Sequence, residues 1–170
     1  KKNNNDNSLI ISGSRGIGKT SSIKLILNQL NYNPLFLYFN NLKNKKVIEK
    51  IITRNTRYRN VYNSMTKNKL KRFVLVIDDS ETVTLSSEKT SLTELYKRNK
   101  KEKLFSIIFL TTFHSNAKLI TEIRKQGCSE IKYNKLTDLD LKKLINKICK
   151  KENMTINIDK VIKKIITFSQ

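Results

Sequence analysis

Short apolar runs alternate along the chain with longer segments in which apolar residues recur at helical spacing. Five of the runs are predicted to be β-strands: Ser8–Ser12, Leu35–Phe39, Phe73–Ile77, Ser106–Thr112 and Glu130–Tyr133. The middle three are almost continuous in leucine, isoleucine, valine and phenylalanine, which is typical of strands buried on both faces of a parallel sheet. The alternation therefore predicts an α/β fold with helices on both faces of the sheet.

Two segments between the predicted strands carry an apolar helical stripe. The stripe that follows the first strand consists of Ile23, Ile26, Leu27 and Leu30. The stripe that precedes the last strand includes Leu119, Ile120 and Ile123. We expect both stripes to pack against the sheet.

The pattern changes after the last predicted strand. Thr137 and Asp140 approximate a capping box at the start of a helical segment over 137–153, and a second helix is expected over about 158–168. The sequence therefore predicts three parts, a polar linker over 1–7, an α/β core over 8–135 and the beginning of a small helical domain over 136–170. Because this last domain looks incomplete, we expect the chain to be a fragment of a larger protein.

The chain is strongly basic. Its 170 residues include 35 Lys and Arg against 14 Asp and Glu, a formal net charge of +21. Such an excess favours polyanionic partners such as nucleic acid. The basic residues are spread along the chain, however, and an AT-rich coding sequence would produce the same bias, so both origins of the charge stay open.

Cysteine usage and hydropathy exclude several classes of protein. Cys128 and Cys149 lie far apart, with no CxxC pair and no clustered histidines, which argues against a zinc site or a disulfide framework. No apolar stretch approaches the ~20 residues needed to span a bilayer. We therefore expect an intracellular protein with no membrane partner.

The segment GSRGIGKT, residues Gly13–Thr20, lies between the first strand and the first helix and matches the phosphate-binding pattern G-x-x-x-x-G-K-[ST]. In such a loop the backbone N–H groups surround phosphate oxygens, and the glycines avoid Cβ clashes. We expect Lys19 to meet the β- and γ-phosphates of ATP and Thr20 to ligate Mg²⁺. The other residues expected to contact the nucleotide are Gly13, Ser14, Arg15, Gly16, Ile17, Gly18 and Ser21.

Two adjacent carboxylates follow the third predicted strand. The carboxyl ends of strands line the crevice in which α/β sheets bind ligands, so we expect Asp78 to bind magnesium, directly or through water. Asp79 is the candidate for polarising the attacking water. Thr111 and Thr112 end the fourth predicted strand, where a hydroxyl is suited to hold that water or to contact the γ-phosphate. The competing interpretation, that the two aspartates only open a turn, stays open.

Together with these motifs, the segments LYFNNLKNKK, VLVIDDSE and IIFLTTFHSN resemble the AAA+ ATPases, and within them the sliding-clamp loaders of the replication factor C group, most like the large subunit. The resemblance covers nearly the whole chain from Ser8, with Asn40 at an asparagine position of the loaders. It implies a P-loop NTPase fold with a five-stranded parallel sheet in the order 5-1-4-3-2, followed by a helical lid. It also implies a catalytic set of Lys19, Asp79 and Thr112, the last at the family's sensor-1 position.

The resemblance implies partners as well. They are other AAA+ loader subunits in a hetero-oligomer, a sliding clamp, and primer-template DNA bound through its phosphate backbone without reading of its sequence. ATP and Mg²⁺ are the implied cofactors, and an intracellular site of DNA replication, nuclear, viral or cytoplasmic, is the implied location.

Three departures from the family pattern qualify these expectations. The family usually has Asp-Glu where this chain has Asp78-Asp79, so hydrolysis is expected to be weak. Small loader subunits carry Ser-Arg-Cys where this chain has QGC, residues 126–128, so the chain is expected to receive an arginine finger in trans rather than to donate one. The family's sensor-2 arginine would lie beyond Gln170.

Two other functions remain as alternatives. One is a hydrolysis-impaired architectural subunit of an alternative clamp loader or unloader. The other is a P-loop kinase that acts on a small molecule, for which the sequence shows no acceptor-binding cluster.

Overall fold

The computed structural model describes residues 7–38, 50, 53, 72–83, 86–113, 117–154, 160, 161 and 164. The chain divides into two compact units, Lys1–Tyr133 and Asn134–Gln170. The strands of the first unit are β1 (Ser8–Gly13), β2 (Asn33–Leu37), β3 (Phe73–Ile77), β4 (Ser106–Thr111) and β5 (Ser129–Tyr133). Its helices are α1 (Lys19–Gln29), the 3₁₀ helix η2 (Ser80–Thr82), α3 (Ser86–Glu102) and α4 (Lys118–Lys125), and the second unit contains α5 (Asp138–Lys151).

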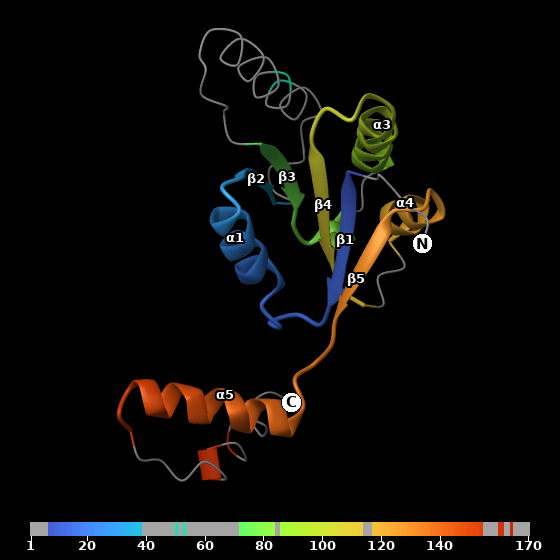
Figure 1. Cartoon of the computed structure of the whole chain (residues 1–170). Coiled ribbons are helices and arrows are strands. Elements are labelled where there is room, and N and C mark those ends of the chain that lie inside the picture. The colour runs from blue at the N-terminus through green and yellow to red at the C-terminus, as the bar shows by residue number, and fades with distance from the viewer. Residues whose placement is uncertain are drawn as a thin grey trace, which may run out of the picture. The chain divides into compact units, whose positions relative to one another are not determined.

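The five strands form one sheet in the order β2-β3-β4-β1-β5, and every neighbouring pair is parallel (Figure 1). Read from the other edge, this is the order 5-1-4-3-2, so the expected fold is confirmed. Because all strands run the same way, their carboxyl ends lie at one edge of the sheet. Strand β4 lies between β1, which leads into the glycine-rich loop, and β3, which leads into the paired aspartates.

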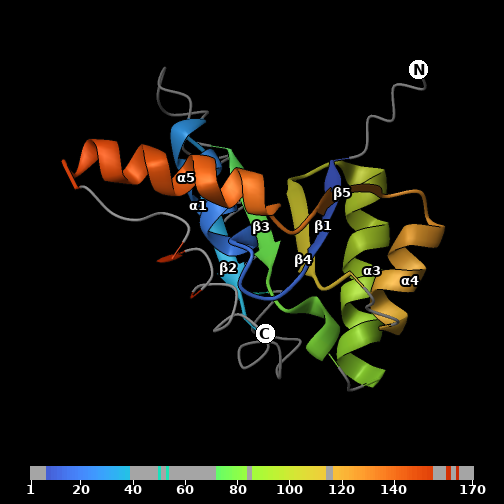
Figure 2. The same ribbon diagram turned by 90° about the horizontal axis from the view of Figure 1, so that it is seen from below.

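Helices cover both faces of the sheet, as expected from the alternation of elements. Figure 2 shows α1 on one face and α3 and α4 on the other. The core under α1 consists of Ile11, Ile23, Leu27, Val74, Val76, Ile108 and Leu110. The core on the opposite face is larger and includes Ile10, Ile77, Leu92, Tyr96, Phe109, Leu119, Ile120 and Ile123.

Strand β2 differs from the expectation. It begins at Asn33, two residues before the expected Leu35, and it is an edge strand. Only Leu37 is fully buried in it, so the expectation of burial on both faces is wrong for this strand. Its position explains how Pro34 is tolerated, because an edge strand can lose one backbone donor without breaking the sheet. Phe39 and Asn40 lie outside the described residues.

The helical predictions were confirmed in part. The stripe of α4 is fully buried, but only Ile23 and Leu27 of the α1 stripe are, whereas Ile26 is 42% exposed and Leu30 is 61% exposed. Leu30 follows the last residue of α1, where the helical stripe no longer applies. Helix α3 was not expected, because its many charged residues hide the i, i+4 pair Leu92 and Tyr96 that it buries.

Helix α5 in the second unit begins as the sequence predicts. The backbone N–H of Asp140 donates to the Thr137 hydroxyl at 3.2 Å, and the Thr137 N–H donates to the Asp140 carboxylate at 3.3 Å, which completes a capping box. The expected helix over 158–168 lies mostly outside the described residues. Within the described ranges, no helix has the length and apolar character to cross a membrane.

Candidate nucleotide-binding site

The glycine-rich loop connects β1 to α1, and two of its glycines are required for different physical reasons. A Cβ on Gly13 would lie 2.9 Å from the Cβ of Tyr133 and 3.0 Å from its carbonyl oxygen, because β5 packs directly alongside. Gly18 has a φ of +92° and is the N-cap of α1. Space excludes a side chain at the first position, and the left-handed backbone disfavours one at the second.

The N-terminus of α1 lacks the side-chain groups that usually complete a helix. The N-cap residue Gly18 has no side chain that could cap α1, and the first turn of α1 contains no acidic residue. The first backbone N–H groups of a helix have no partner within the helix, and the helix dipole places positive charge there. Unlike α5, which has its capping box, α1 presents an end suited to an anion such as a phosphate group.

Lys19 closes the loop. Its ammonium Nζ donates to the carbonyl oxygens of Gly13 and Ser14, each at 2.9 Å. These bonds hold a positive charge inside the curve of the loop. The amine that the sequence predicts to meet the phosphates therefore lies within the loop that would bind them.

Thr20 and Asp78, 58 positions apart in the sequence, meet at the start of α1. The Thr20 hydroxyl donates to Oδ2 of Asp78 at 2.8 Å, and the backbone N–H of Asp79 donates to Oδ1 at 2.9 Å. Asp78 is only 6% exposed. Its carboxylate is therefore fixed in a buried position beside the hydroxyl that the sequence predicts to bind the same ion.

This pair of oxygen donors suits magnesium bound together with nucleotide. Mg²⁺ is usually held by one or two carboxylates and by the phosphates of the substrate, whereas a dedicated protein cage would need more ligands. Among the described residues no group of three or more His, Cys, Asp or Glu side chains could hold a metal. The residues present thus fit an ion that arrives with its phosphates.

Asp79 follows Asp78 directly, and Thr112 follows β4, the strand that lies between β1 and β3. Asp79 is exposed and has a φ of +47° at the start of η2. Thr112 follows β4 directly and is partly exposed. Because side chains alternate along a strand, Thr112 continues the face of Leu110, which packs in the core under α1, the helix that carries Thr20. Thr111 belongs to the opposite face and is 1% exposed.

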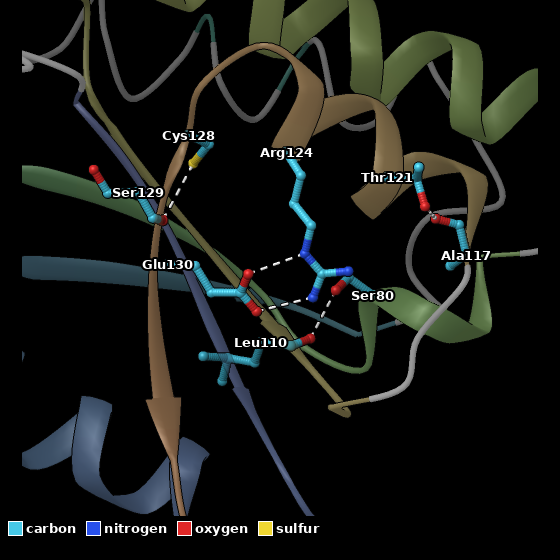
Figure 3. A network of polar contacts seen from close by, with 8 residues as sticks. All are labelled: Ser80, Leu110, Ala117, Thr121, Arg124, Cys128, Ser129 and Glu130. Carbon is cyan, nitrogen blue, oxygen red and sulfur yellow. Dashed lines mark hydrogen bonds and ion pairs between the residues drawn. The ribbon is translucent and has the colours of Figure 1, made fainter.

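Ser80 was not predicted from the sequence to be a residue of the site. Its hydroxyl is fully buried and donates to the backbone carbonyl oxygen of Leu110 at 2.7 Å (Figure 3). This bond joins the turn after the paired aspartates to the strand that ends at Thr111. The only signal in the sequence was a small polar residue directly after two acids, and that residue type is common in turns of every kind.

An ion pair between α4 and β5 was also missed. The Arg124 guanidinium donates two hydrogen bonds to the Glu130 carboxylate, at 3.0 and 2.8 Å (Figure 3). These bonds lower the pKa of Glu130 from its usual value of 4.5. Three residues after Arg124, Gly127, where the sequence resemblance predicts the counterpart of the small loader subunits' arginine, has a φ of +84°. The arginine nearest that position in the sequence is therefore engaged within its own chain.

The strand order, the loop that closes around Lys19 and the Thr20–Asp78 contact together define a P-loop nucleotide-binding domain. The chain belongs to the ATPase family associated with various cellular activities (AAA), whose family model matches residues 9–136. It therefore carries an ATPase domain.

One curated relative and three similar solved structures have names that refer to DNA replication. Over 95% of its length the chain is 26% identical to a protein of Acanthamoeba polyphaga mimivirus that carries the provisional name replication factor C large subunit, and the match covers 37% of that protein. Similar solved structures include a DNA replication initiation factor, at 16% identity over 94% of the chain with a TM-score of 0.59. A second is the replication initiator DnaA bound to AMPPCP and single-stranded DNA, at 17% identity over 91% of the chain with a TM-score of 0.59. A third is AMPPCP-bound DnaA from Aquifex aeolicus, at 16% identity over 91% of the chain with a TM-score of 0.58.

The chain spans 37% of the length of this curated relative and 49–50% of the solved chains. At 16–17% identity, the solved structures show that this chain has the same fold, and they show no more than the fold.

Proposed function

We propose that this chain is the ATP-binding and ATP-hydrolysing part of a subunit of a DNA sliding-clamp loader. The observation that carries the proposal is the match of 95% of the chain to the mimivirus protein named as a replication factor C large subunit. In this proposal ATP binding between neighbouring AAA+ subunits assembles a hetero-oligomer that grips the sliding clamp and primer-template DNA. Hydrolysis then releases both, at a nuclear, viral or cytoplasmic site of DNA replication.

The site residues have separate roles in this proposal. The backbone of residues 13–21 surrounds the phosphates, and the Lys19 ammonium neutralises the β- and γ-phosphates. Thr20 and Asp78 hold Mg²⁺, which supplies charge stabilisation at the terminal phosphate when bound. Asp79 polarises the attacking water, and Thr112 contacts the γ-phosphate. The 2.8 Å contact between Thr20 and Asp78 supports the assignment, since it unites two predicted ligands.

The chain is proposed to receive an arginine finger from a neighbouring subunit and to donate none. Two observations support this. Gly127 has no side chain to offer, and the Arg124 guanidinium is engaged by both oxygens of Glu130. The net charge of +21 supports a contact with the DNA phosphate backbone that does not read base sequence.

A second candidate is a hydrolysis-impaired architectural subunit of an alternative clamp loader or unloader. The observation that favours it is Asp79, whose side chain is one methylene shorter than the glutamate of the loaders and which lies exposed at a turn. Such a subunit binds ATP to hold the assembly together and turns it over slowly.

The test measures ATP hydrolysis by the full-length protein in its native assembly, with and without primer-template DNA and a sliding clamp. We expect the two together to stimulate hydrolysis, and affinity purification to recover smaller AAA+ subunits. Lys19→Ala should abolish the stimulation, and Lys118→Ala, an exposed lysine at the start of α4, is the matched control that should retain it. Hydrolysis that responds to a small metabolite, and to neither DNA nor clamp, would contradict the proposal in favour of a kinase.

A further inference from the structure

Two helices on the same face of the sheet end beside each other in exposed basic residues. Helices α3 and α4 both run from the carboxyl ends of the strands toward their amino ends, because each joins one parallel strand to the next. Figure 1 and Figure 2 show the two helices side by side. The Lys100 ammonium on α3 donates a hydrogen bond to the carbonyl oxygen of Gln126, the C-cap of α4, so the two C-terminal ends are in contact.

Five exposed lysines lie at these two ends, and we name them the amino-edge cluster. They are Lys97, Lys100, Lys101, Lys103 and Lys125. Lys100 contacts the Gln126 carbonyl oxygen and the Tyr96 ring, and within the described ranges the other four side chains have no hydrogen-bond or ion-pair partner. The one acid among residues 97–103 is Glu102, which is paired with Arg98. The positive charge of the cluster is therefore not neutralised in the described part of the chain.

Helix stability does not explain this arrangement of lysines. Lys97 and Lys101 are four positions apart on α3, where two like charges destabilise a helix. The helix dipole favours Lys100 and Lys101, which lie in the last turn, but its effect is confined to that turn. Lys103 has a φ of +50°, a conformation that glycine or asparagine adopts more readily than lysine. Lysine is therefore placed where other residue types would suit the local backbone better.

The turn that carries Lys103 is held in place by a buried side chain. Asn99 is 1% exposed, and its amide donates to the carbonyl oxygen of Phe105 at 2.8 Å and accepts from the Phe105 N–H at 3.2 Å. The Lys103 N–H donates to the backbone carbonyl oxygen of Asn99 at 2.7 Å. Because the backbone is ordered before a partner arrives, binding at this turn costs less conformational entropy.

The amino-edge cluster is separate from the nucleotide site. That site lies at the carboxyl ends of the strands, and the six residues of β4 span about 17 Å between the two edges of the sheet. This distance exceeds the Debye length of about 8 Å at physiological salt, so the cluster contributes little to attracting the phosphates of ATP. Its positive charge suits a different anion.

The composition of the cluster favours a duplex phosphate backbone. The centres of protein interfaces are depleted in lysine and enriched in aromatic residues, whereas exposed lysines commonly contact the phosphates of nucleic acid. Single strands also stack on exposed aromatic rings, but Tyr96, the one aromatic residue among residues 96–104, is 0% exposed.

We propose that the amino-edge cluster binds the phosphate backbone of duplex DNA without reading its sequence. The inference rests on the proposed function and deepens it, because it assigns the contact with DNA to named residues. It also separates that contact from ATP, since the two ligands bind at opposite edges of the sheet.

The test compares the full-length protein with two triple variants that have the same net charge, by measuring their binding to a blunt duplex DNA over a range of salt concentrations. The cluster variant is Lys97→Gln, Lys101→Gln and Lys103→Gln, and it leaves the hydrogen-bonded Lys100 in place. The control variant removes three exposed lysines from α4, β5 and α5. They are Lys118, Lys132 and Lys147, each replaced by glutamine.

Each phosphate contact contributes about 0.9 to the slope of log K against log salt concentration. We expect the cluster variant to reduce the magnitude of this slope by about 2.7, which corresponds to about 500-fold weaker binding at about 0.1 M salt relative to 1 M. The control variant should retain the wild-type slope. Arginine at the three cluster positions preserves the charge and should restore binding. All variants should bind a nonhydrolysable ATP analogue with wild-type affinity, and duplexes of unrelated sequence should bind alike.

Three results would count against the inference or its basis. Equal losses in the two triple variants mean that net charge rather than the cluster binds DNA, which overturns the inference while the proposed function stands. Vesicles of anionic lipid that bind through the cluster lysines, when duplex DNA does not, overturn it as well. A wild-type protein that binds no DNA even in its native assembly contradicts the proposed function itself.

Discussion

Lengthening the side chain of Asp79 by one methylene should accelerate ATP hydrolysis. The residue lies at the turn that follows β3, next to the buried Asp78, and it is the candidate for polarising the attacking water. Asp79→Glu extends the carboxylate by about 1.5 Å, the length of one carbon–carbon bond. A misplacement of about 1 Å at a reacting centre can cost about 100-fold in rate, or about 2.7 kcal/mol of activation free energy. We therefore expect a gain of up to about 100-fold.

The same substitution should lower the stability of the fold. Asp79 has a φ of +47°, in the left-handed region, where the short polar side chain of aspartate is tolerated better than that of glutamate. We expect the free energy of unfolding to fall by about 1 kcal/mol, which lowers the Tm of a chain of this size by roughly 2–4 °C. Catalysis and stability thus change in opposite directions.

The assay is single-turnover hydrolysis at saturating ATP, with ATP affinity and Tm measured on the same samples. Asp79→Asn is the matched variant, because asparagine has the same shape and tolerates the left-handed region but carries no charge. It should retain the Tm and lose about 100-fold or more in rate. If Asp79→Glu binds ATP normally yet hydrolyses it no faster, the reach of the carboxylate does not limit the rate. A wild-type rate in Asp79→Asn would exclude this residue as the group that polarises water.

Three further substitutions test the surroundings of the site. Ser80→Ala removes a fully buried hydrogen bond, so it should lower the free energy of unfolding by about 1 kcal/mol and slow hydrolysis. Ser91→Ala removes an exposed hydroxyl hydrogen bond on α3 and should lower the free energy of unfolding by less than about 0.5 kcal/mol, as measured by thermal unfolding. Glu130→Gln should lower the free energy of unfolding by about 1–2 kcal/mol at pH 7, because it removes the charged partner of Arg124. The pKa of Glu130 is lowered in the folded chain, so its contribution is present above pH 4.5 and is lost as the pH falls through the folded value. The wild-type and variant stabilities should therefore converge in acid, and a difference that persists there would contradict the ion-pair interpretation. Glu88 is 6% exposed and neither of its carboxylate oxygens has a partner within the described ranges, so Glu88→Met should raise the Tm by roughly 2–4 °C. A fall would show that the favourable position of this acid in the first turn of α3 outweighs its burial.

The loop and the paired aspartates could be predicted because their residue types follow from local requirements. Gly18 must adopt a positive φ, and glycine, lysine and threonine in this order between a strand and a helix are typical of a phosphate-binding turn. Asp78 could be predicted as their partner because the carboxyl ends of parallel strands share one edge of the sheet. In each case a short segment carries the whole signal.

The rest of the site depends on contacts that no short segment encodes. Ser80 is significant only because the carbonyl oxygen of Leu110 lies beside it, and those two residues are 30 positions apart. The exposure of β2 follows from its place at the edge of the sheet, although its apolar run resembles that of the buried β3.

The open N-terminus of α1 has a consequence for how the protein responds to its ligand. Helix α1, whose N-cap is Gly18, has no capping side chain and no acidic residue in its first turn, so its first backbone N–H groups are open to an anion. The terminal phosphates of ATP would then act as the N-terminal cap of this helix, because their oxygens accept hydrogen bonds from its first N–H groups. When the phosphates dissociate, these N–H groups lose their acceptors, and the first turn of α1 should become less stable.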